Sequence, residues 1–341
     1  MKTLTLQEPG RFSLQDTPPP SHALKNQALV RVHRVGICGT DLHAFQGKQP
    51  FFAYPRIIGH ELAVEIVELG ETDEAHDVAV GDWCAVEPYL NCGQCRACQR
   101  GYTNACSALK VLGVHIDGGM RELLNLPIRK LHRVRGLSLA QIALVETMGI
   151  GAHAVRRARL EAGEFVLVIG AGAIGMGTMQ FAKLANAKVI AMDVNPDRLH
   201  FCQNVLGIPY TIDARHNSLD QLREILGEDR PSAVFDATGN LTSMTNAFQY
   251  VAHAGRLIFV GLAQGDITFN DPYFHSHEIT LLASRNATRD DFSWVIEALE
   301  KHTVSVDRWV THETNPEELP TDFPNWLHPQ SGLLKAMLRF T

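Results

Sequence analysis

The stretch Phe165–Gly177, FVLVIGAGAIGMG, carries the strongest structural signal in the 341-residue chain. It opens with the continuous apolar run Phe165–Gly170, and such a run without polar alternation is typical of a strand that is buried on both faces. A helix-compatible segment follows over Ala173–Asn186, and a second apolar run follows over Lys188–Asp193. A strand, a helix and a strand within about 30 residues form a βαβ unit, so this region predicts a parallel sheet.

A glycine-rich turn lies between the first strand and the helix. Gly170, Gly172 and Gly175 match the pattern G-x-G-x-x-G, in which backbone N–H groups at a helix N-terminus can face a pyrophosphate. Asp193 ends the next predicted strand, where a carboxylate accepts hydrogen bonds from ribose hydroxyls. Its charge favours NAD over NADP, although Arg198 lies close enough in sequence to weaken this preference. The alternative is a glycine turn that binds no ligand.

The same alternation of strands and helices continues along the chain. Apolar runs are found at Ala233–Thr238, Arg256–Leu262 and Glu278–Ser284, with helical intervals at Leu219–Leu226 and Ser243–Val251. This order predicts an open, doubly wound parallel sheet of the α/β class. Two residues of these runs are further candidates for cofactor binding: Thr238 and Gly261.

The first third of the chain has a different texture. The segments Ala28–Cys38, Ala63–Gly70 and Val80–Pro88 are strand candidates without long helices between them, which predicts a barrel-like β domain. The polar tail after residue 284 fits neither pattern, and we expect it to pack on this first domain. The predicted domains are therefore a catalytic domain over 1–149 and 285–341, and a dinucleotide-binding domain over 150–284.

Composition excludes several classes of protein. A hydrophobic fraction of 45% is that of a folded chain, which excludes dominant disorder. The 31 basic and 37 acidic residues give a net charge of −6, so we expect no nucleic acid and no anionic membrane as partner. No apolar run reaches the roughly 18 residues of a membrane span, and the N-terminus lacks the pattern of a signal peptide. We expect a soluble cytoplasmic protein.

Four of the seven cysteines lie close together in the sequence. The pattern Cys92-x2-Cys95-x2-Cys98-x7-Cys106 supplies the four thiolates of a closed structural zinc site. Iron–sulfur runs begin in the same way but close with three residues and a proline, which this pattern does not. A zinc knuckle for nucleic acid is also disfavoured, because only two charged residues, both arginines, lie within the loop.

A second set of candidate metal ligands is dispersed along the chain. Cys38 lies in GICGTDLH, His60 and Glu61 lie in IIGHE, and Glu146 lies in LVETMG. Each alone can be explained as a buried thiol, a turn histidine or a solvated carboxylate. Together they are the ligand types of an open, catalytic zinc site.

Several motifs carry a resemblance to a known family. GICGTDLHAF, YPRIIGHE, the four-cysteine loop and VLVIGAGAIGMG resemble the zinc-dependent medium-chain alcohol dehydrogenases over nearly the whole chain. The context of Glu146 resembles their polyol, sorbitol and threonine dehydrogenase branch. The segments PFFAYP, GVHIDGG and SRNAT are most similar to bacterial L-galactonate dehydrogenases. The resemblance implies a β-rich GroES-like catalytic domain joined to a Rossmann domain.

The resemblance also implies roles for individual residues. The catalytic zinc ligands fall on Cys38 and His60, with Glu146 or Glu61 as the third. A proton relay falls on Thr40 and His43. Two further positions match residues that act around the metal or the substrate: Asp41, which would orient the zinc-bound imidazole, and Arg285, which would lie in the substrate pocket.

These observations predict an enzyme with NAD and two Zn²⁺ per chain, one catalytic and one structural. It would oxidise a secondary hydroxyl of a small-molecule sugar acid or polyol, with an L-galactonate-type substrate favoured. The enzymatic alternatives are a sorbitol-like polyol and L-threonine as substrates. The non-enzymatic alternatives are a zinc-stapled nucleotide sensor and a nucleic-acid binder. We expect a homodimer or homotetramer.

Overall fold

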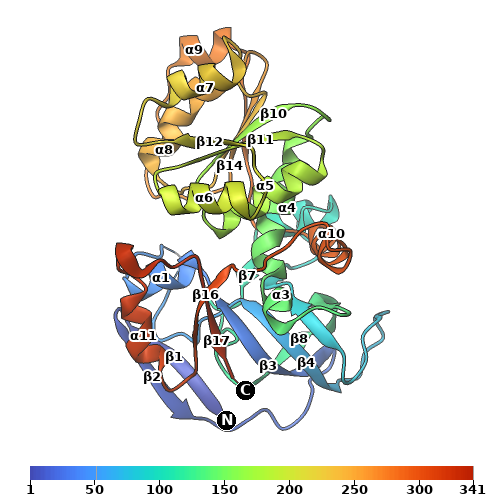
Figure 1. The fold of residues 1–341 in the computed structure, drawn as a ribbon. Coiled ribbons are helices and arrows are strands. Elements are labelled where there is room, and N and C mark those ends of the chain that lie inside the picture. Colours follow the sequence, from blue (N-terminus) through green and yellow to red (C-terminus); the bar gives the residue numbers. More distant parts are fainter. Residues whose placement is uncertain (51, 341) are drawn as a thin grey trace. The chain divides into compact units, whose positions relative to one another are not determined.

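The computed structural model describes residues 1–50 and 52–340, and the chain forms two compact units. The first unit contains Met1–Glu146 and Thr288–Thr341, and the second contains Thr147–Ala287. The chain therefore builds part of the first unit, then the whole second unit, and then returns to the first (Figure 1). The second unit begins and ends a few residues outside the limits expected from the sequence. Within the described residues, no helix has the length and apolar character that crossing a membrane requires.

The second unit is built on a six-stranded sheet in which every neighbouring pair is parallel. In spatial order the strands are β12 (Tyr210–Asp213), β11 (Lys188–Asp193), β10 (Phe165–Ile169), β13 (Ala233–Asp236), β14 (Arg256–Phe259) and β15 (Thr280–Ala283). The strand order reverses between β10 and β13, which is the point where such sheets bind ligands beyond the carboxyl ends of their strands. The predicted doubly wound sheet is confirmed.

Helices connect the strands of this sheet. They are α4 (Val145–Ala158), which enters the unit from the first, α5 (Ala173–Leu184), α6 (Pro196–Asn204), α7 (Ser218–Leu226), α8 (Leu241–Asn246) with the 3-10 turn η3 (Ala247–Tyr250), and α9 (Asp271–Ser276). Four of them begin at an asparagine whose side chain accepts a hydrogen bond from a backbone N–H of the first turn: Asn195, Asn217, Asn240 and Asn270. Asparagine is among the best residues at this position because it satisfies an otherwise unpaired donor.

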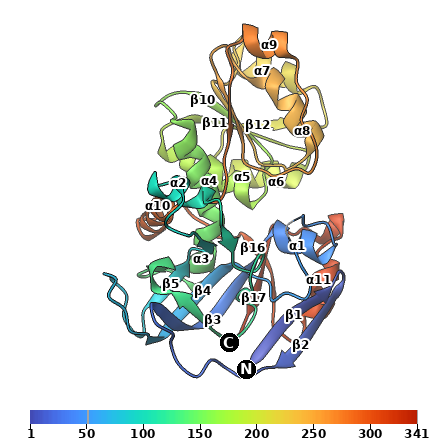
Figure 2. The ribbon, with the colours of Figure 1, turned by 180° about the vertical axis from the view of Figure 1, so that it is seen from behind.

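The first unit is rich in strands, as predicted. A seven-stranded sheet has the order β16 (Val310–Thr314), β17 (Lys335–Arg339), β3 (Gln27–Ile37), β4 (Glu61–Leu69), β5 (Trp83–Val86) and β9 (Leu131–Arg133), and β8 (Leu123–Pro127) also pairs with β3. Two separate two-stranded antiparallel sheets complete the unit: the hairpin of β1 (Lys2–Glu8) and β2 (Arg11–Asp16), and the pair of β6 (Tyr89–Leu90) and β7 (Lys110–Val111). Strand β17 comes from the C-terminal tail and lies antiparallel to β3 (Figure 2).

Short helices surround the strands of the first unit. They are α1 (Gly39–Phe45), α2 (Arg96–Gln99), α3 (Leu139–Ala143), α10 (Arg289–Glu300) and α11 (Leu319–Asn325), with 3-10 turns η1 (Thr103–Ala105), η2 (Ile128–Lys130) and η4 (Pro329–Ser331). The rings of Phe12, Phe45 and Phe323 lie with centroids 5.0 to 5.5 Å apart. These contacts pack α1 and α11 against the hairpin of β1 and β2, and they hold α1 in position.

Candidate functional site

Strands β3 and β4 bring three of the predicted metal ligands together. Cys38 follows the end of β3 and is the N-cap residue of α1, while His60 and Glu61 lie at the start of β4. In the antiparallel register Glu61 pairs with Gly36. One ligand atom from each of Cys38, His60 and Glu61 lies within 4.8 Å of the other two. A thiol, an imidazole and a carboxylate at this spacing form a donor set suited to zinc.

Glu61 is buried in a space that depends on a glycine. A Cβ atom at Gly36 would lie 2.0 Å from Glu61 Oε2, so only glycine leaves room for this carboxylate. Both carboxylate oxygens accept hydrogen bonds from Lys335 Nζ on β17, at 2.7 and 2.8 Å. The ammonium group also donates to Ile37 O at 3.3 Å. Strand β17 therefore supplies the positive charge that pairs with Glu61, one of the three candidate metal ligands.

His60 is buried and its ring is incompletely satisfied by the polypeptide. Nδ1 has no hydrogen-bond partner and lies 3.9 Å from Asp41 Oδ1, which also lacks a partner. The other oxygen of Asp41 accepts a hydrogen bond from Cys38 N at 2.9 Å. Burial opposes protonation of His60, but the charges of Asp41 and Cys38 outweigh it and raise the imidazole pKa. A buried imidazole beside a thiol and two carboxylates fits a cation site.

Glu146 is not part of the set of three ligands. It lies in the first turn of α4 and is buried, and burial raises the pKa of its carboxyl group. The hydroxyl of Tyr89 donates a hydrogen bond to Glu146 Oε1. The charges of His60 and Lys335 also act on the pKa of Glu146, so this carboxylate belongs to the same buried polar cluster.

Thr40 and His43, the predicted proton relay, both lie on α1, which begins directly after Cys38. Residues three apart on a helix are neighbours on its surface. Thr40 is half-buried and His43 is exposed, so the pair runs from partly enclosed surroundings to solvent.

The four predicted cysteine ligands form a second cluster. Their sulfur atoms all lie within 4.8 Å of one another, and Cys106 Sγ lies 3.5 Å from Cys92 Sγ and 3.8 Å from Cys95 Sγ. Zinc–sulfur bonds of about 2.3 Å in a tetrahedron place sulfur atoms about 3.8 Å apart. The sequence spacing therefore delivers a cage of the size that zinc requires.

Backbone N–H groups point at the sulfur atoms of this cage. Cys95 N donates to Cys92 Sγ and Cys92 N to Cys106 Sγ, each at 3.3 Å. Hydrogen bonds from the backbone of Cys98 and Ser107 lower the pKa of Cys95 to about 5. Because a metal binds the thiolate form, the lowered pKa favours metal binding at Cys95.

The residues predicted to bind a dinucleotide lie at the carboxyl end of the sheet of the second unit. Gly170 follows β10 with a φ of +95° and Gly175 lies in the first turn of α5. A Cβ at Gly175 would lie 1.7 Å from Gly170 O, whereas a Cβ at Gly172 would meet only Arg198 Nη1 at 3.8 Å. Gly175 is therefore needed for the close packing of turn and helix, and Gly172 leaves open space in front of the turn.

Asp193 closes this turn from the neighbouring strand. Its Oδ2 accepts a hydrogen bond from Ala171 N at 2.5 Å, and its Oδ1 accepts one from Asn195 N at 2.8 Å. The half-buried Arg198 lies in the first turn of α6. The carboxylate is thus held at the end of β11, next to the glycine turn where an adenosine ribose would lie.

Thr238 and Gly261 lie at the carboxyl ends of β13 and β14. Thr238 donates hydrogen bonds to Asp236 Oδ1 through its N and Oγ1, at 2.9 and 2.6 Å. A Cβ at Gly261 would lie 2.3 Å from Gly239 N, so the two turns are in close contact. Asp236, which the sequence did not single out, is fully buried and organises this edge of the sheet.

Two family models match long segments of the chain. Residues 24–136 match the family model of the alcohol dehydrogenase GroES-like domain, and residues 173–301 match that of the zinc-binding dehydrogenases. The chain is 39% identical to L-galactonate-5-dehydrogenase of Escherichia coli K12, over 100% of this chain and 99% of that protein. The chain belongs to the zinc-dependent medium-chain alcohol dehydrogenases.

Further relatives define the branch. A sorbitol dehydrogenase of Halalkalibacterium halodurans is 31% identical over 89% of each chain. The crystal structure of RspB from E. coli CFT073 with NADH superposes with a TM-score of 0.91, at 27% identity, over 100% of this chain and 99% of that one. The protein is thus an NAD(P)-dependent alcohol or polyol dehydrogenase of the polyol branch.

Arg285, the predicted substrate residue of this dehydrogenase, follows β15 in the second unit. Its side chain is exposed and takes part in an interaction within the chain. An exposed guanidinium group can change its conformation to bind a carboxylate or a pair of hydroxyl groups.

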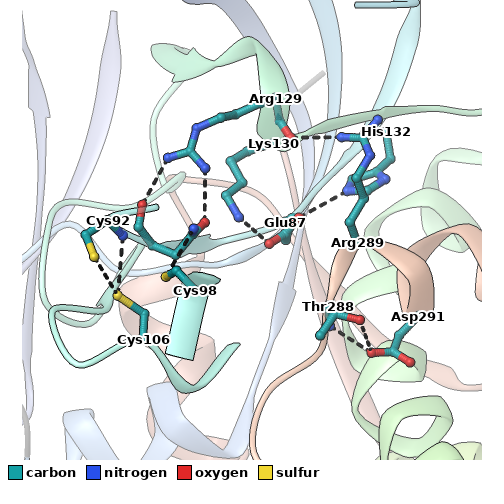
Figure 3. Close-up of polar contacts among 11 residues, drawn as sticks. Glu87, Cys92, Cys98, Cys106, Arg129, Lys130, His132, Thr288, Arg289 and Asp291 are labelled. Atoms are coloured by element: carbon teal, nitrogen blue, oxygen red, sulfur yellow. Dashed lines mark hydrogen bonds and ion pairs between the residues drawn. The ribbon is translucent and has the colours of Figure 1, made fainter. Parts of the chain in front are cut away.

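Residues that the sequence did not single out contact the candidate metal ligands, and Figure 3 shows those beside the cysteine cage. Lys335 and Tyr89 hold the two glutamates, as described above. Beside the cysteine cage, Arg129 donates to Oδ1 and O of Asn91, both at 3.0 Å, and Asn91 Nδ2 donates to Cys98 Sγ at 3.6 Å. No local motif marks these residues, because each acts through a contact between distant parts of the chain.

Proposed function

We propose that this dehydrogenase oxidises a secondary hydroxyl group of a sugar acid or polyol with NAD, and that an L-galactonate-type sugar acid is its substrate. The observation that carries the proposal is the convergence of Cys38, His60 and Glu61 within 4.8 Å, with a buried imidazole nitrogen that lacks a partner. Such a set has no evident purpose in a nucleotide sensor that carries only a structural metal.

Two zinc ions are assigned to the chain. Cys38, His60 and Glu61 would hold the catalytic ion, with Glu146 as the fourth protein group facing it. The four sulfur atoms of the cysteine loop would hold the structural ion. Zinc bound in the first set supplies Lewis-acid polarisation of the substrate hydroxyl group.

The proposed proton transfer uses two residues of α1. Thr40 would accept the proton of the substrate hydroxyl group while it gives up its own hydroxyl proton, and His43 would pass a proton to solvent. NAD⁺ bound in the second unit would supply the acceptor for the hydride of the carbinol C–H bond. The substrate would lose one proton and one hydride for each carbonyl group formed, so the product would be a ketone.

The cofactor is proposed to be NAD because of Asp193. Its carboxylate is fixed by two backbone N–H groups at the end of β11. A 2′-phosphate beside a fixed negative charge is repelled, whereas ribose hydroxyls donate hydrogen bonds to it. The glycines of the turn, with Thr238 and Gly261 at the neighbouring strand ends, would hold the rest of the dinucleotide.

The substrate class rests on the relatives and on Arg285. L-galactonate is the substrate named for the 39% identical relative, and its carboxylate suits a guanidinium. Arg285→Ala should then lower kcat/KM on an aldonate about 10- to 150-fold, the equivalent of a charge-assisted bond of about 1.5 to 3 kcal/mol. Simple secondary alcohols should be affected far less.

The test combines a substrate screen with metal counting. NADH formation is measured with L-galactonate, other aldonates, sorbitol and L-threonine, and zinc is measured in the wild type and in the Cys38→Ser variant. We expect turnover of an aldonate, two zinc ions in the wild type, and one zinc and no activity in the variant. Turnover of sorbitol or L-threonine alone would overturn the sugar-acid assignment, and retention of both zinc ions by the variant would overturn the catalytic site.

A further inference from the structure

We propose that Tyr89 is a positioning residue of this dehydrogenase, whose hydroxyl group fixes the Glu146 carboxylate at the catalytic metal centre. The inference rests on the proposed function, because it takes Glu146 as a group that faces the catalytic metal. It adds a residue that lies outside the metal-ligand set and outside the proton relay.

The contact itself is buried and directional. Tyr89 is 2% exposed and Glu146 is 5% exposed, and the phenol donates its hydrogen bond to Glu146 Oε1. A tyrosine hydroxyl has one proton to donate, so it engages one carboxylate oxygen and leaves the second for another partner. A carboxylate held in this way has less freedom to rotate, and its second oxygen is left for a metal ion.

Tyr89 is itself held from both sides along the chain. Two residues before it, Glu87 is bound by Lys130 and His132, and two residues after it, Asn91 is bound by Arg129 (Figure 3). The backbone around Tyr89 is thereby tied to η2 on both sides, and also to β9 through His132.

The ring of Tyr89 is fixed as well. It lies edge-on to Phe292 of α10, with centroids 6.4 Å apart and planes at 78°. The ring therefore packs independently of its hydroxyl group. Tyr89→Phe removes one O–H and keeps this packing, which makes it a clean test of the hydrogen bond.

The expected consequence is a change in metal retention. Residues that orient metal-binding groups typically alter metal affinity about 10- to 100-fold when they are mutated. Without the donor, the Glu146 carboxylate gains rotational freedom and the catalytic centre loses part of its preorganisation. We expect one of the two zinc ions to leave about 10- to 100-fold faster, while the zinc of the cysteine loop is unaffected.

The experiment follows zinc release from the holoenzyme to a chromophoric chelator. Tyr89→Phe is compared with the wild type and with Tyr102→Phe, a matched control in the same unit whose side chain is 45% exposed. The same substitution is then made in a Glu146→Gln background. If Tyr89 acts through the charged carboxylate, Tyr89→Phe accelerates release in the wild-type background and adds little in the Glu146→Gln background.

Each of the remaining outcomes would contradict either this inference or the proposed function. Unchanged zinc release in Tyr89→Phe, with loss of one zinc in Cys38→Ser, overturns the inference and leaves the proposed function intact. Equal acceleration of both zinc ions shows a general structural role and also overturns it, as does an undiminished effect in the Glu146→Gln background. Retention of both zinc ions by Cys38→Ser removes the proposed function itself.

Discussion

Replacement of Lys130 by methionine should destabilise the protein strongly, because it leaves a charge buried without its partner. Lys130 is 3% exposed and Glu87 is 2% exposed, and the ammonium group donates to Glu87 Oε1 (Figure 3). After the substitution Glu87 retains His132 Nε2, at 3.4 Å. Breaking a buried ion pair from one side costs about 3–5 kcal/mol. In a chain region of 150 to 250 residues, each kcal/mol of lost stability lowers the melting temperature by about 2–4 °C. The melting temperature should therefore fall by about 6–20 °C.

The assay is urea unfolding followed by tryptophan fluorescence, combined with calorimetry. The double variant Glu87→Gln, Lys130→Met should recover part of the loss, because it removes the uncompensated charge. The matched control is Lys301→Met in the exposed pair of Lys301 and Glu297 on α10, whose side chains are 65% and 60% exposed. That change should stay within about 0.5 kcal/mol. A loss below about 1 kcal/mol for Lys130→Met would refute the argument from burial.

Three further predictions concern titration and the cofactor. Burial lowers the pKa of His132 more than Glu87 raises it, so the unfolded state binds more protons and stability should decline as the pH falls below about 6.5. Melting curves from pH 8 to 5 should show this decline, and His132→Gln should flatten it. Gly175→Ala should lower the melting temperature sharply because its Cβ would lie 1.7 Å from a backbone oxygen. Gly172→Ala should melt like the wild type and weaken NADH binding in a fluorescence titration. Asp193→Ser should lower kcat/KM for NAD about 10- to 150-fold, for a lost charge-assisted bond of about 1.5–3 kcal/mol, and a wild-type preference for NADP in steady-state kinetics would contradict this reasoning.

The parts of the site that the sequence predicted are those encoded locally. The glycine turn follows a continuous apolar run, and β11 has the bounds Lys188–Asp193 that the pattern indicated. The cysteine loop needs only its own spacing, because a metal cage of four sulfur atoms can close within a short segment. Short edge strands carry less signal: Tyr210–Asp213, β12, has four residues with a single buried one among them, and it was not predicted.

Contacts between distant segments could not be predicted in the same way. Lys335 reaches Glu61 across 274 residues, and this meeting depends on the order of β17, β3 and β4 in the sheet. A lysine in a polar tail gives no sign of such a position. Tyr89 likewise has the sequence context of an ordinary core aromatic residue, and only the path of α4 beside it reveals its carboxylate partner.

The late position of Lys335 in the chain has a consequence for biosynthesis. The strand that carries it, β17, is translated after every residue of the second unit. Domains generally fold as units while the chain emerges from the ribosome, so the dinucleotide-binding unit can be complete while Glu61 still lacks its ammonium partner. A nascent chain can therefore complete its dinucleotide-binding unit before Lys335 pairs with Glu61 in the first unit.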